Sequence, residues 1–553
     1  MKIPCTNSEN RQCSFSLRPV TPSEVEKIIK GLKNSKSTGT DYIDTWIIKL
    51  VARDIIPAIT HIVNLSISQS EFPNIWKLSK VVPLLKKGDP LTPKNYRPVA
   101  LLPIFSKILE KAVFLQLVEY LDTNGLLHPN HHGSRQHHNT ATALIQMYDQ
   151  WLEEVEDGKM VGVMMVDLSA AFDMVDHKLL LEKLELFGLD ENALQWVSSY
   201  LSQRYQSVCV DGCLSPPLPV DCGVPQGSIL GPLFYVLFTS DIPDLVHDHP
   251  VDVQAPISYC PQCGSTVCYV DDCTYSHGDK DPAALSATLS IQYKRISSYM
   301  TANKLVINDD KTHLVVMGTK ATAARRDEVT LQAGGHIIRP TRTEKLLGGN
   351  ICENLKWKEH LQENDQSLVR QLTSRINGLV KVSHCASFST RLMVANGIFL
   401  SKMSYLIQLW GGADIYLLAR LQVLQNKAAR AVTGKSWFTS TRRLLEECKW
   451  LSVRQLVFYQ TVMGVQKIVM SGKPDHLSKK FSNDHPYRTR QAAGGGLRFG
   501  ENFDGKSDLS HTSFCYRGTV DYNRIPVYIR RAKTMQTFKY KLKQWISTNI
   551  PLD

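Results

Sequence analysis

One stretch of thirteen residues decides the fold and carries the first candidate functional residue. It reads Val161-Gly162-Val163-Met164-Met165-Val166-Asp167-Leu168-Ser169-Ala170-Ala171-Phe172-Asp173. Its first six residues form an unbroken apolar run, which is typical of a strand buried on both faces. Asp167 ends that run. A carboxylate at the mouth of a buried strand costs free energy unless a positive group meets it. A single aspartate in this position is more often a helix cap than a ligand, so the stretch needs a partner elsewhere in the chain.

The partner is a second acidic motif, Tyr269-Val270-Asp271-Asp272, at the end of another expected strand. Two adjacent carboxylates repel each other and a third nearby adds to the repulsion. Divalent cations remove it, and two magnesium ions roughly 4 Å apart would bind the attacking and leaving oxygens of a phosphoryl transfer. An Asp-Asp pair alone is usually a solvated turn. The two motifs together favour a metal-dependent site.

Further polar motifs surround the acidic ones. Between them lies Gly223-Val224-Pro225-Gln226-Gly227-Ser228, where glycine lets the backbone approach a ligand closely and Gln226 offers both donors and an acceptor. Upstream, Lys86, Lys87 and Asn95-Tyr96-Arg97-Pro98 supply cations suited to a triphosphate. Downstream stands Asn308-Asp309-Asp310-Lys311-Thr312.

The order of these motifs resembles that of the reverse transcriptases of non-LTR (LINE-type, jockey-like) retrotransposons. The resemblance covers roughly residues 21–435 and includes Leu346-Leu347-Gly348, which is similar to the family's primer grip. It implies an α+β, right-hand polymerase fold of fingers, palm and thumb. The expected regions are a helical N-terminal extension (1–70), fingers (71–160), palm with fingers-side insertions and primer grip (161–365), a helical thumb (366–435) and a mostly helical C-terminal region of unknown role (436–553).

The resemblance also implies roles for individual residues. Asp167 and Asp271 would bind two Mg²⁺ ions, for which Mn²⁺ can substitute, with Asp272 a third carboxylate close by. Lys311 would protonate or neutralise the leaving pyrophosphate. The expected nucleotide-binding residues are Arg97, Lys86, Lys87, Phe172 beneath the incoming sugar, Gln226 and Gly227.

Nucleic-acid binding is expected at Leu347 and Gly348 and on one later helix. In that helix Leu417, Leu421, Leu424, Ala428 and Ala431 form an apolar stripe, while Arg420, Lys427 and Arg430 line another face. Most such basic faces are only solvated. The expected partners are an RNA template, a DNA primer or target end, and dNTPs, and we expect no endonuclease in this chain.

Composition agrees with a polyanionic partner. The chain of 553 residues carries 64 Lys and Arg against 52 Asp and Glu, a net charge of +12, which favours nucleic acid or an anionic membrane surface but also fits a merely basic protein. No run approaches the ~18–20 apolar residues of a membrane span, so no membrane role is expected. Thirteen cysteines without a repeating framework and a polar start at residues 1–13 predict an intracellular protein of the nucleus, the cytoplasm or both.

One cluster is not explained by the resemblance. His247, His249, Cys260 and Cys263 include a Cys-x-x-Cys pair, but no second such pair follows and the His-x-His spacing is tight, so we expect no structural zinc. Cys268 and Cys273, which flank the acidic pair, are expected to be packed or reactive bystanders.

Other readings of the motifs remain. A viral-type RNA polymerase would share the acidic motifs, but Phe172 should crowd a ribose 2′-hydroxyl. A non-catalytic RNA-binding remnant would not need Asp167, Asp271, Asp272 and Lys311. A group II intron maturase or a telomerase protein is a further neighbour.

Local signals predict several elements. Thr21-Pro22-Ser23-Glu24 reads as a capping box, and Pro57 is expected to start the second member of a helical pair over 43–70. Strands are expected at 81–85, 161–166, 305–307 and 313–317, and one ending at Val270. Helices are expected at 104–122, 178–186 and 282–300, the last capped by Asp281. A loop is expected over 483–511.

Overall fold

The computed structural model describes residues 14–35, 37–86, 88–246, 260, 262–363, 365–482, 496–499 and 508–552. The chain divides into two compact units. Unit 1 comprises Met1–Gln136, Val166–Cys273 and Gln292–Lys311, and unit 2 comprises His137–Met165, Thr274–Ile291 and Thr312–Asp553. Both units contain helices and strands, which confirms the expected mixture of helix and strand.

The elements of unit 1 are helices, short helical turns and strands. In chain order they are α1 Pro22–Gly31, α2 Thr45–Leu50, α3 Ala52–Gln69, η1 Asn74–Trp76, β1 Leu78–Leu85, η2 Pro93–Asn95, β2 Tyr96–Leu101, α4 Ile104–Thr123, β4 Leu168–Ser169, α6 His177–Leu186, α7 Glu191–Leu201, β5 Arg204–Val210, β6 Cys213–Leu214, β7 Leu218–Val220, α8 Gly231–Phe238, η3 Ile242–Val246, β8 Ser265–Tyr269, β10 Val306–Ile307 and η4 Asp309–Lys311.

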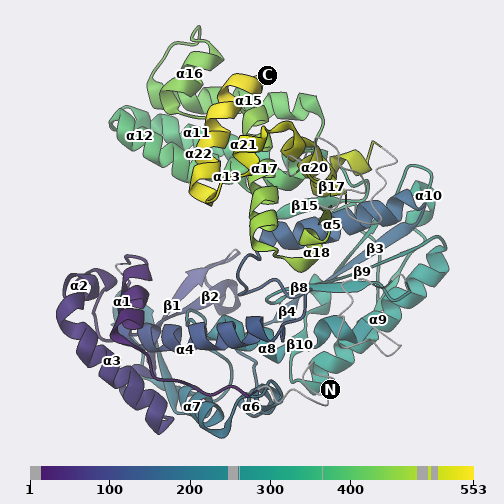
Figure 1. The fold of residues 1–553 in the computed structure, drawn as a ribbon. Helices are drawn as coiled ribbons and strands as arrows, with labels where there is room; N and C mark the ends of the chain where they lie inside the picture. Colours follow the sequence, from purple (N-terminus) through teal and green to yellow (C-terminus); the bar gives the residue numbers. More distant parts are fainter. Residues whose placement is uncertain are drawn as a thin grey trace. The chain divides into compact units, whose positions relative to one another are not determined.

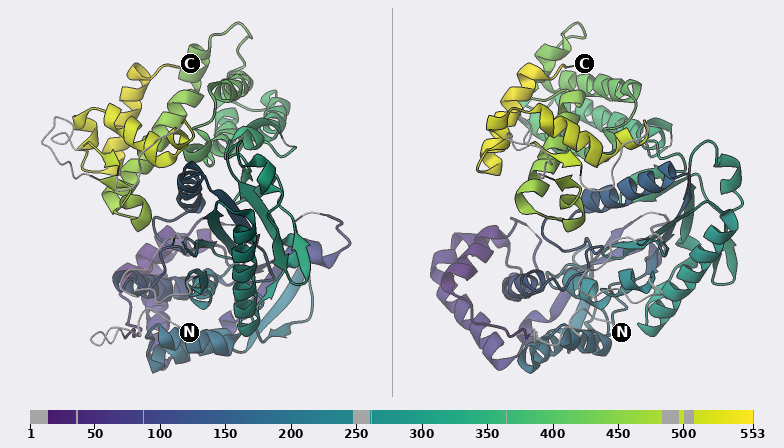
Figure 2. Two further views of the ribbon diagram at one scale, coloured as in Figure 1. Left: turned by 90° about the vertical axis from the view of Figure 1, so that its right-hand side faces the viewer. Right: turned by 45° about the vertical axis from the view of Figure 1, so that its right-hand side comes forward.

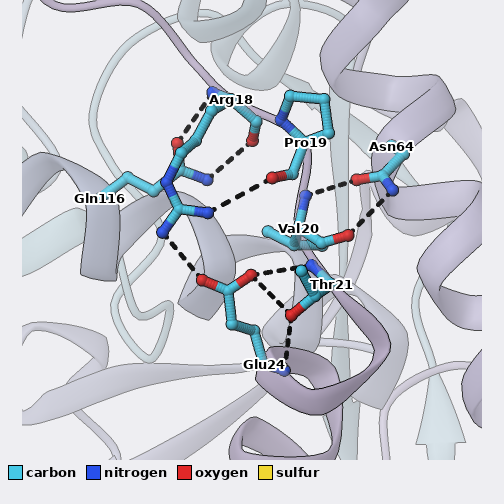
Figure 3. A network of polar contacts seen from close by, with 7 residues as sticks. All are labelled: Arg18, Pro19, Val20, Thr21, Glu24, Asn64 and Gln116. Atoms are coloured by element: carbon cyan, nitrogen blue, oxygen red, sulfur yellow. Dashed lines mark hydrogen bonds and ion pairs between the residues drawn. The ribbon is translucent and has the colours of Figure 1, made fainter.

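The start of α1 confirms the predicted capping box. Thr21 Oγ1 accepts a hydrogen bond from Glu24 N at 3.3 Å, and Glu24 Oε2 accepts one from Thr21 N at 2.7 Å. Arg18 adds a bond of 2.8 Å from its guanidinium to Glu24 Oε1, as Figure 3 shows. These bonds give the Thr21 amide a partner and the Glu24 amide a second acceptor beside the carbonyl of Thr21, which fixes where the helix begins.

Side-chain amides tie the segment before α1 to two longer helices. Asn64 of α3 bonds Val20 N at 2.7 Å and Val20 O at 3.0 Å. Gln116 of α4 bonds Arg18 N at 2.9 Å and Arg18 O at 3.0 Å (Figure 3). Helix α1 also packs against α3 and α4 (Figure 1). The N-terminal helices are therefore docked onto the rest of unit 1.

The prediction that Pro57 starts a helix is wrong, because α3 begins at Ala52 and Pro57 lies inside it. Proline removes the amide that would bond the carbonyl of Arg53. Both residues are exposed, so water can satisfy that carbonyl. The proline is tolerated because it falls in the second turn, on the solvent face.

A five-stranded sheet in unit 1 supports the loop that carries Gln226. Its order is β2-β1-β5-β6, with β7 also paired to β5. Strand β1 is antiparallel to β2, with Leu84 opposite Arg97, and parallel to β5, with Lys80 opposite Ser207. Strand β1 begins three residues before the expected strand at 81–85.

The elements of unit 2 are strands near its start and helices thereafter, with α9 crossing the unit boundary. In chain order they are α5 Thr140–Glu156, β3 Met160–Val166, β9 Asp272–Asp279, α9 Pro282–Ala302, β11 His313–Met317, α10 Ala323–Arg326, β12 Leu331–Ala333, β13 His336–Ile338, β14 Thr343–Leu346, β15 Gly349–Cys352, π-helix η5 Glu359–Glu363, α11 Leu368–Ser383, α12 Phe388–Ala395, π-helix η6 Asn396–Leu400, α13 Ser401–Ser404, α14 Ile407–Trp410, α15 Ile415–Thr433, α16 Thr441–Cys448, α17 Val453–Ser471, α18 Asp475–Ser478, β16 Phe481–Ser482, β17 Arg498–Phe499, η7 Ser510–Thr512, α20 Phe514–Arg524, α21 Val527–Arg530 and α22 Met535–Asn549.

Strands β11, β3 and β9 lie side by side in that order. Strand β11 is antiparallel to β3, with Val315 opposite Val163, and every residue of β3 is buried as the apolar run predicts. Asp281 caps α9, since its carboxylate accepts a bond from Ala284 N at 3.0 Å. These local predictions are confirmed.

The helices of unit 2 that follow residue 366 pack against one another. Helix α15 contacts α11, α16 and α17, and α17 contacts α20 and α22 (green to yellow in Figure 2). The predicted apolar stripe of α15 is buried except for Ala431, which is half-buried. The loop expected over 483–511 lies mostly outside the described residues, and its described part includes β17, which pairs with β16. Across the described ranges, none of the helices combines the length and the apolar character that crossing a membrane requires.

Candidate active site

Asp167 meets Lys311 in unit 1, although 144 residues separate them in the sequence. Lys311 Nζ lies 3.2 Å from Asp167 Oδ2. The backbone explains the encounter, because Ile307 in β10 pairs with Leu168 in β4 and Asn308 N donates to Asp167 O at 2.9 Å. Both side chains keep solvent access, 40% for Asp167 and 61% for Lys311, so a ligand can reach them.

Asp271 and Asp272 follow a strained residue. Val270 has φ of 60°, a conformation that costs a β-branched residue free energy and is retained where the surroundings enforce it. Gly133 faces it closely, since a Cβ at position 133 would lie 2.4 Å from Val270 Cγ2 and 2.9 Å from Val270 N. The tight turn between β8 and β9 thus fixes the acidic pair.

The carboxylates influence one another. Burial, with Asp271 and Asp167 adding, raises the pKa of Asp272 to about 6. Burial also raises the pKa of Asp271, and Asp167 acts in the same direction while Arg97 and Lys86 oppose it. The site therefore gathers three acidic side chains within electrostatic reach of two cations that the sequence places far upstream.

The donor chemistry suits a hard divalent cation, because carboxylate oxygens are the ligands that Mg²⁺ prefers. Neighbouring carboxylates repel one another, which raises the pKa of a carboxyl group, and a bound cation offsets that repulsion. Within the described ranges, however, no group of three or more His, Cys, Asp or Glu side chains is arranged to hold a metal ion. The acidic residues offer the oxygen atoms and the negative charge that a divalent cation needs, but in the described ranges their side chains are not arranged around a single point.

The loop that carries Gln226 is anchored on two sides. Gly223 N donates to Val175 O and Val224 N donates to Phe172 O, both at 2.8 Å. Ala100 N in β2 donates to Gln226 O, also at 2.8 Å.

Gly227 and Asp173 complete the arrangement of this loop. Gly227 has φ of 131°, and a Cβ there would lie 2.4 Å from the carbonyl oxygen of Ala100. Gln226 Nε2 donates to both carboxylate oxygens of Asp173, at 3.0 and 2.8 Å. The sequence displayed Asp173 within a motif, but we gave it no role. Its contact shows that the amide of Gln226 is oriented by a neighbour.

A cavity of about 350 Å³ opens beside this loop. Strands β1 and β2 contribute Ser79, Val81, Pro98 and Ala100 to its wall. The other lining residues are Asp173, Arg204, Gln206, Pro219, Val220, Asp221, Cys222, Gly223, Val224, Pro225 and Gln226. Of the predicted nucleotide-binding residues that the structure describes, only Gln226 lies on the cavity wall.

Phe172 is half-buried and rests on Tyr235 of α8, with ring centroids 4.9 Å apart and an interplanar angle of 33°. Tyr235 is fully buried, and its hydroxyl has no hydrogen-bond partner within the described part of the chain. One face of the Phe172 ring is thus supported by the core.

Glu110 of α4 is a buried residue that the sequence analysis missed. It is 0% exposed, and its Oε2 accepts bonds from Ile229 N at 2.8 Å, Leu230 N at 3.2 Å and Tyr200 Oη at 3.3 Å. Its Oε1 accepts a bond from Ser106 Oγ at 2.9 Å. A glutamate in the middle of an apolar helix was the available signal. Glu110 holds the amides between the Gln226 loop and α8.

The remaining predicted residues are placed as follows. Lys86 and Arg97 are exposed in unit 1, and Lys87 lies outside the described residues. Leu347 and Gly348 form the turn between β14 and β15 in unit 2, where Tyr405 Oη donates to Leu347 O at 2.6 Å.

The three basic residues predicted on one helix lie on α15 of unit 2. Arg420 and Lys427 are exposed, whereas Arg430 is half-buried and bonds backbone carbonyls. Basic side chains on this helix are therefore accessible at two of the three predicted positions.

The cysteine predictions have separate outcomes. Cys260 and Cys263 are buried, and His247 and His249 lie outside the described residues. Cys268 and Cys273 are buried with their Sγ atoms 3.4 Å apart, which confirms that they are packed.

Comparison with known protein families gives the site its context. Residues 84–351 match the family described as reverse transcriptase (RNA-dependent DNA polymerase). This interval contains Asp167, Asp271, Asp272, Lys311 and Gln226.

Several curated proteins are similar over most of this chain. The RNA-directed DNA polymerase from mobile element jockey of Drosophila melanogaster is 27% identical over 439 residues, which are 79% of this chain and 46% of that protein. The probable RNA-directed DNA polymerase from transposon X-element of the same species is 27% identical over 449 residues, 80% of this chain and 47% of that protein. That from transposon BS is 25% identical over 452 residues, 81% and 48%. The chain thus spans about half the length of the curated relatives it matches, and the resemblance predicted from the motifs is confirmed.

Proposed function

We propose that this chain, whose residues 84–351 form a reverse transcriptase domain, is the RNA-directed DNA polymerase of a non-LTR retrotransposon. It would extend a DNA primer or target end with dNTPs on an RNA template. The observation that carries the proposal is the meeting of Asp167 with Lys311, within electrostatic reach of Asp271 and Asp272.

Asp167 and Asp271, with Asp272 beside them, would hold two Mg²⁺ ions, for which Mn²⁺ can substitute. Bound there, such ions neutralise charge on the attacking and leaving oxygens of the phosphoryl transfer. Lys311 stands 3.2 Å from Asp167, and its ammonium would protonate or neutralise the leaving pyrophosphate. In this proposal the carboxylates bind the metal ions and the lysine acts on the leaving group.

Upstream cations would bind the triphosphate. Arg97 and Lys86 both act on the pKa of Asp271, which supports their facing the same site. Arg97 would hold the triphosphate, with Lys86 or Lys87 assisting.

Gln226 and Phe172 would contact the incoming nucleotide and select its sugar. Gln226 and Gly227 would contact it beside the cavity, with the amide of Gln226 oriented by Asp173. Phe172, supported from behind by Tyr235, would lie beneath the incoming sugar and reject a 2′-hydroxyl.

The right-hand arrangement follows from the family and is part of the proposal. Residues 71–160 would be fingers, 161–365 palm and 366–435 thumb, after an N-terminal extension at 1–70 and before a C-terminal region at 436–553. Leu347 and Gly348 would contact the primer. Arg420 and Lys427 of α15 would face nucleic acid, while the half-buried Arg430 bonds carbonyls of the loop that follows the helix.

The test is primer extension on an RNA template by Asp167→Asn and Asp271→Asn variants. Each change removes a ligand charge but keeps the side-chain shape, so we expect extension to fall at least about a thousandfold while RNA affinity changes little. Asp211→Asn is a matched control, because Asp211 is an exposed aspartate of unit 1 in the turn between β5 and β6. Extension by both active-site variants at the level of the control would overturn the proposal.

A further inference from the structure

Two adjacent aromatic side chains project from the loop between α15 and α16. Trp437 is 66% exposed and Phe438 is 95% exposed. This loop, which we call the aromatic loop, spans residues 434–440 at one end of α15 (Figure 1). Large apolar rings exposed together usually mark a site of interaction.

The aromatic loop is held in place by its own backbone contacts. Arg430 Nη2 donates to Trp437 O at 3.1 Å and to Thr439 O at 3.4 Å. The same guanidinium lies 4.7 Å from the Trp437 ring centroid, a cation–π contact. Thr439 N also donates to Ser436 O at 3.1 Å. The rings are therefore presented by a fixed turn, which lowers the entropy cost of binding.

Basic residues flank the two rings in the sequence. Residues 427–447 contain five Lys and Arg and two Glu, a net charge of +3 by subtraction. Lys427, Arg442 and Arg443 are exposed, while Lys435 lies 3.7 Å from Glu447 and is partly neutralised. Exposed rings flanked by exposed cations fit an anionic partner that also offers planar groups.

We propose that the aromatic loop binds single-stranded nucleic acid. Unpaired bases would stack on Trp437 and Phe438 while Lys427, Arg442 and Arg443 contact the phosphates. Bases of a duplex already stack on one another and cannot cover these rings, so the loop favours a single strand over a primer–template duplex. The proposal rests on the proposed function only in taking nucleic acid as the partner, because binding needs no catalysis.

The test compares the full chain with a Trp437→Ala, Phe438→Ala double variant. Fluorescence anisotropy, without dNTPs, measures the affinity for three labelled probes: a single-stranded oligonucleotide, the same strand carrying abasic sites, and a duplex. Because unpaired bases would stack on both rings, the double variant should bind the single strand at least about tenfold more weakly. Wild type should bind the abasic strand as weakly as the double variant does, and duplex affinity should be unchanged.

Three further variants separate stacking from charge and folding. Trp437→Phe should retain most of the affinity. Tyr416→Ala, an exposed aromatic near the opposite end of α15, should retain all of it. Replacing Lys427 and Arg442 with glutamine should reduce the slope of log affinity against log salt concentration by the contribution of about two phosphate contacts. The preference for the single strand over the abasic strand should remain.

The outcomes also distinguish this inference from the proposed function. Equal affinity of wild type and double variant for every probe overturns the inference and assigns the rings to another partner, such as a protein. An equal loss for duplex and single strand also overturns it, because stacking on unpaired bases would not be involved. If the wild type does not extend a primer but still binds the single strand more tightly than the abasic strand, the proposed polymerase activity is refuted and the inference stands.

Discussion

Replacing Glu110 should loosen the loop that carries Gln226 without touching any residue of the proposed chemistry. The carboxylate is buried in α4 and accepts the backbone amides of Ile229 and Leu230 at 2.8 and 3.2 Å. Those amides precede α8, so the negative charge also lies at the positive end of that helix dipole. A variant at this position changes the support of the loop.

The size of the effect follows from the bonds lost. Glu110→Gln keeps one acceptor oxygen for the two amides, and the hydroxyl of Ser106 can turn to accept from the new amide. Hydrogen bonds to a charged group contribute roughly 1 kcal/mol more than neutral ones, so this variant should lose about 2 kcal/mol locally. Glu110→Leu leaves both amides and the hydroxyl of Tyr200 without an acceptor, and each buried unsatisfied group costs about 1–3 kcal/mol. The leucine variant should therefore lose about 3–9 kcal/mol.

Amide hydrogen exchange measures this locally, in peptides covering residues 223–238. A local loss of about 2 kcal/mol corresponds to exchange roughly 30-fold faster for Glu110→Gln, with a larger increase for Glu110→Leu. Glu119→Gln, an exposed glutamate of the same helix, should leave exchange unchanged. The KM for dNTP should rise in both Glu110 variants if the loop positions Gln226 for the nucleotide. Exchange in Glu110→Leu within about twofold of wild type would refute the idea that this carboxylate holds the loop.

Two other predictions address sugar choice and acid stability. Phe172→Val should lower the preference for dNTP over rNTP, measured as a ratio of kcat/KM, by at least about tenfold if the ring excludes the 2′-hydroxyl, whereas a proportional loss of both substrates would mean that Phe172 only packs on Tyr235. The hydrogen bond from Arg18 lowers the pKa of Glu24 to about 2, so the folded state binds this proton less readily than the unfolded state, and the stabilisation present above the ordinary pKa of 4.5 is lost as pH falls toward 2. Exchange of α1 amides, corrected for intrinsic rates, should accelerate across that window in wild type and change less in Glu24→Gln; identical profiles would contradict the assignment.

Elements with a local cause could be predicted from the sequence. The capping box at Thr21 and Glu24, the buried strand β3 and the Asp281 cap of α9 each depend on residues a few positions apart. Pro57 was misread for the same reason, because a proline marks a helix start only on average. The local signal did not reveal that α3 begins one turn earlier and exposes Arg53, whose carbonyl the proline leaves unpaired.

Contacts between distant segments escaped prediction. Glu110 meets amides 119 and 120 residues away, and Gln226 meets Asp173 53 residues away. No periodicity or spacing encodes such pairs, since they depend on how strands and loops are brought together. The meeting of Asp167 and Lys311 was foreseen only through motif order, which reflects a known fold rather than the chemistry of either residue alone.

The crowding of Gly133 against Val270 decides which of these two positions can vary. Val270 can shorten to alanine while Gly133 stays, because that change only removes the Cγ atoms nearest position 133. A Cβ at position 133 is blocked in either case, since it would meet the backbone nitrogen of residue 270 at 2.9 Å even after the valine side chain is gone. Position 133 is therefore confined to glycine whichever residue stands at 270. Sequence libraries that randomise both should recover variation at 270 on a glycine background and almost none at 133 on any background.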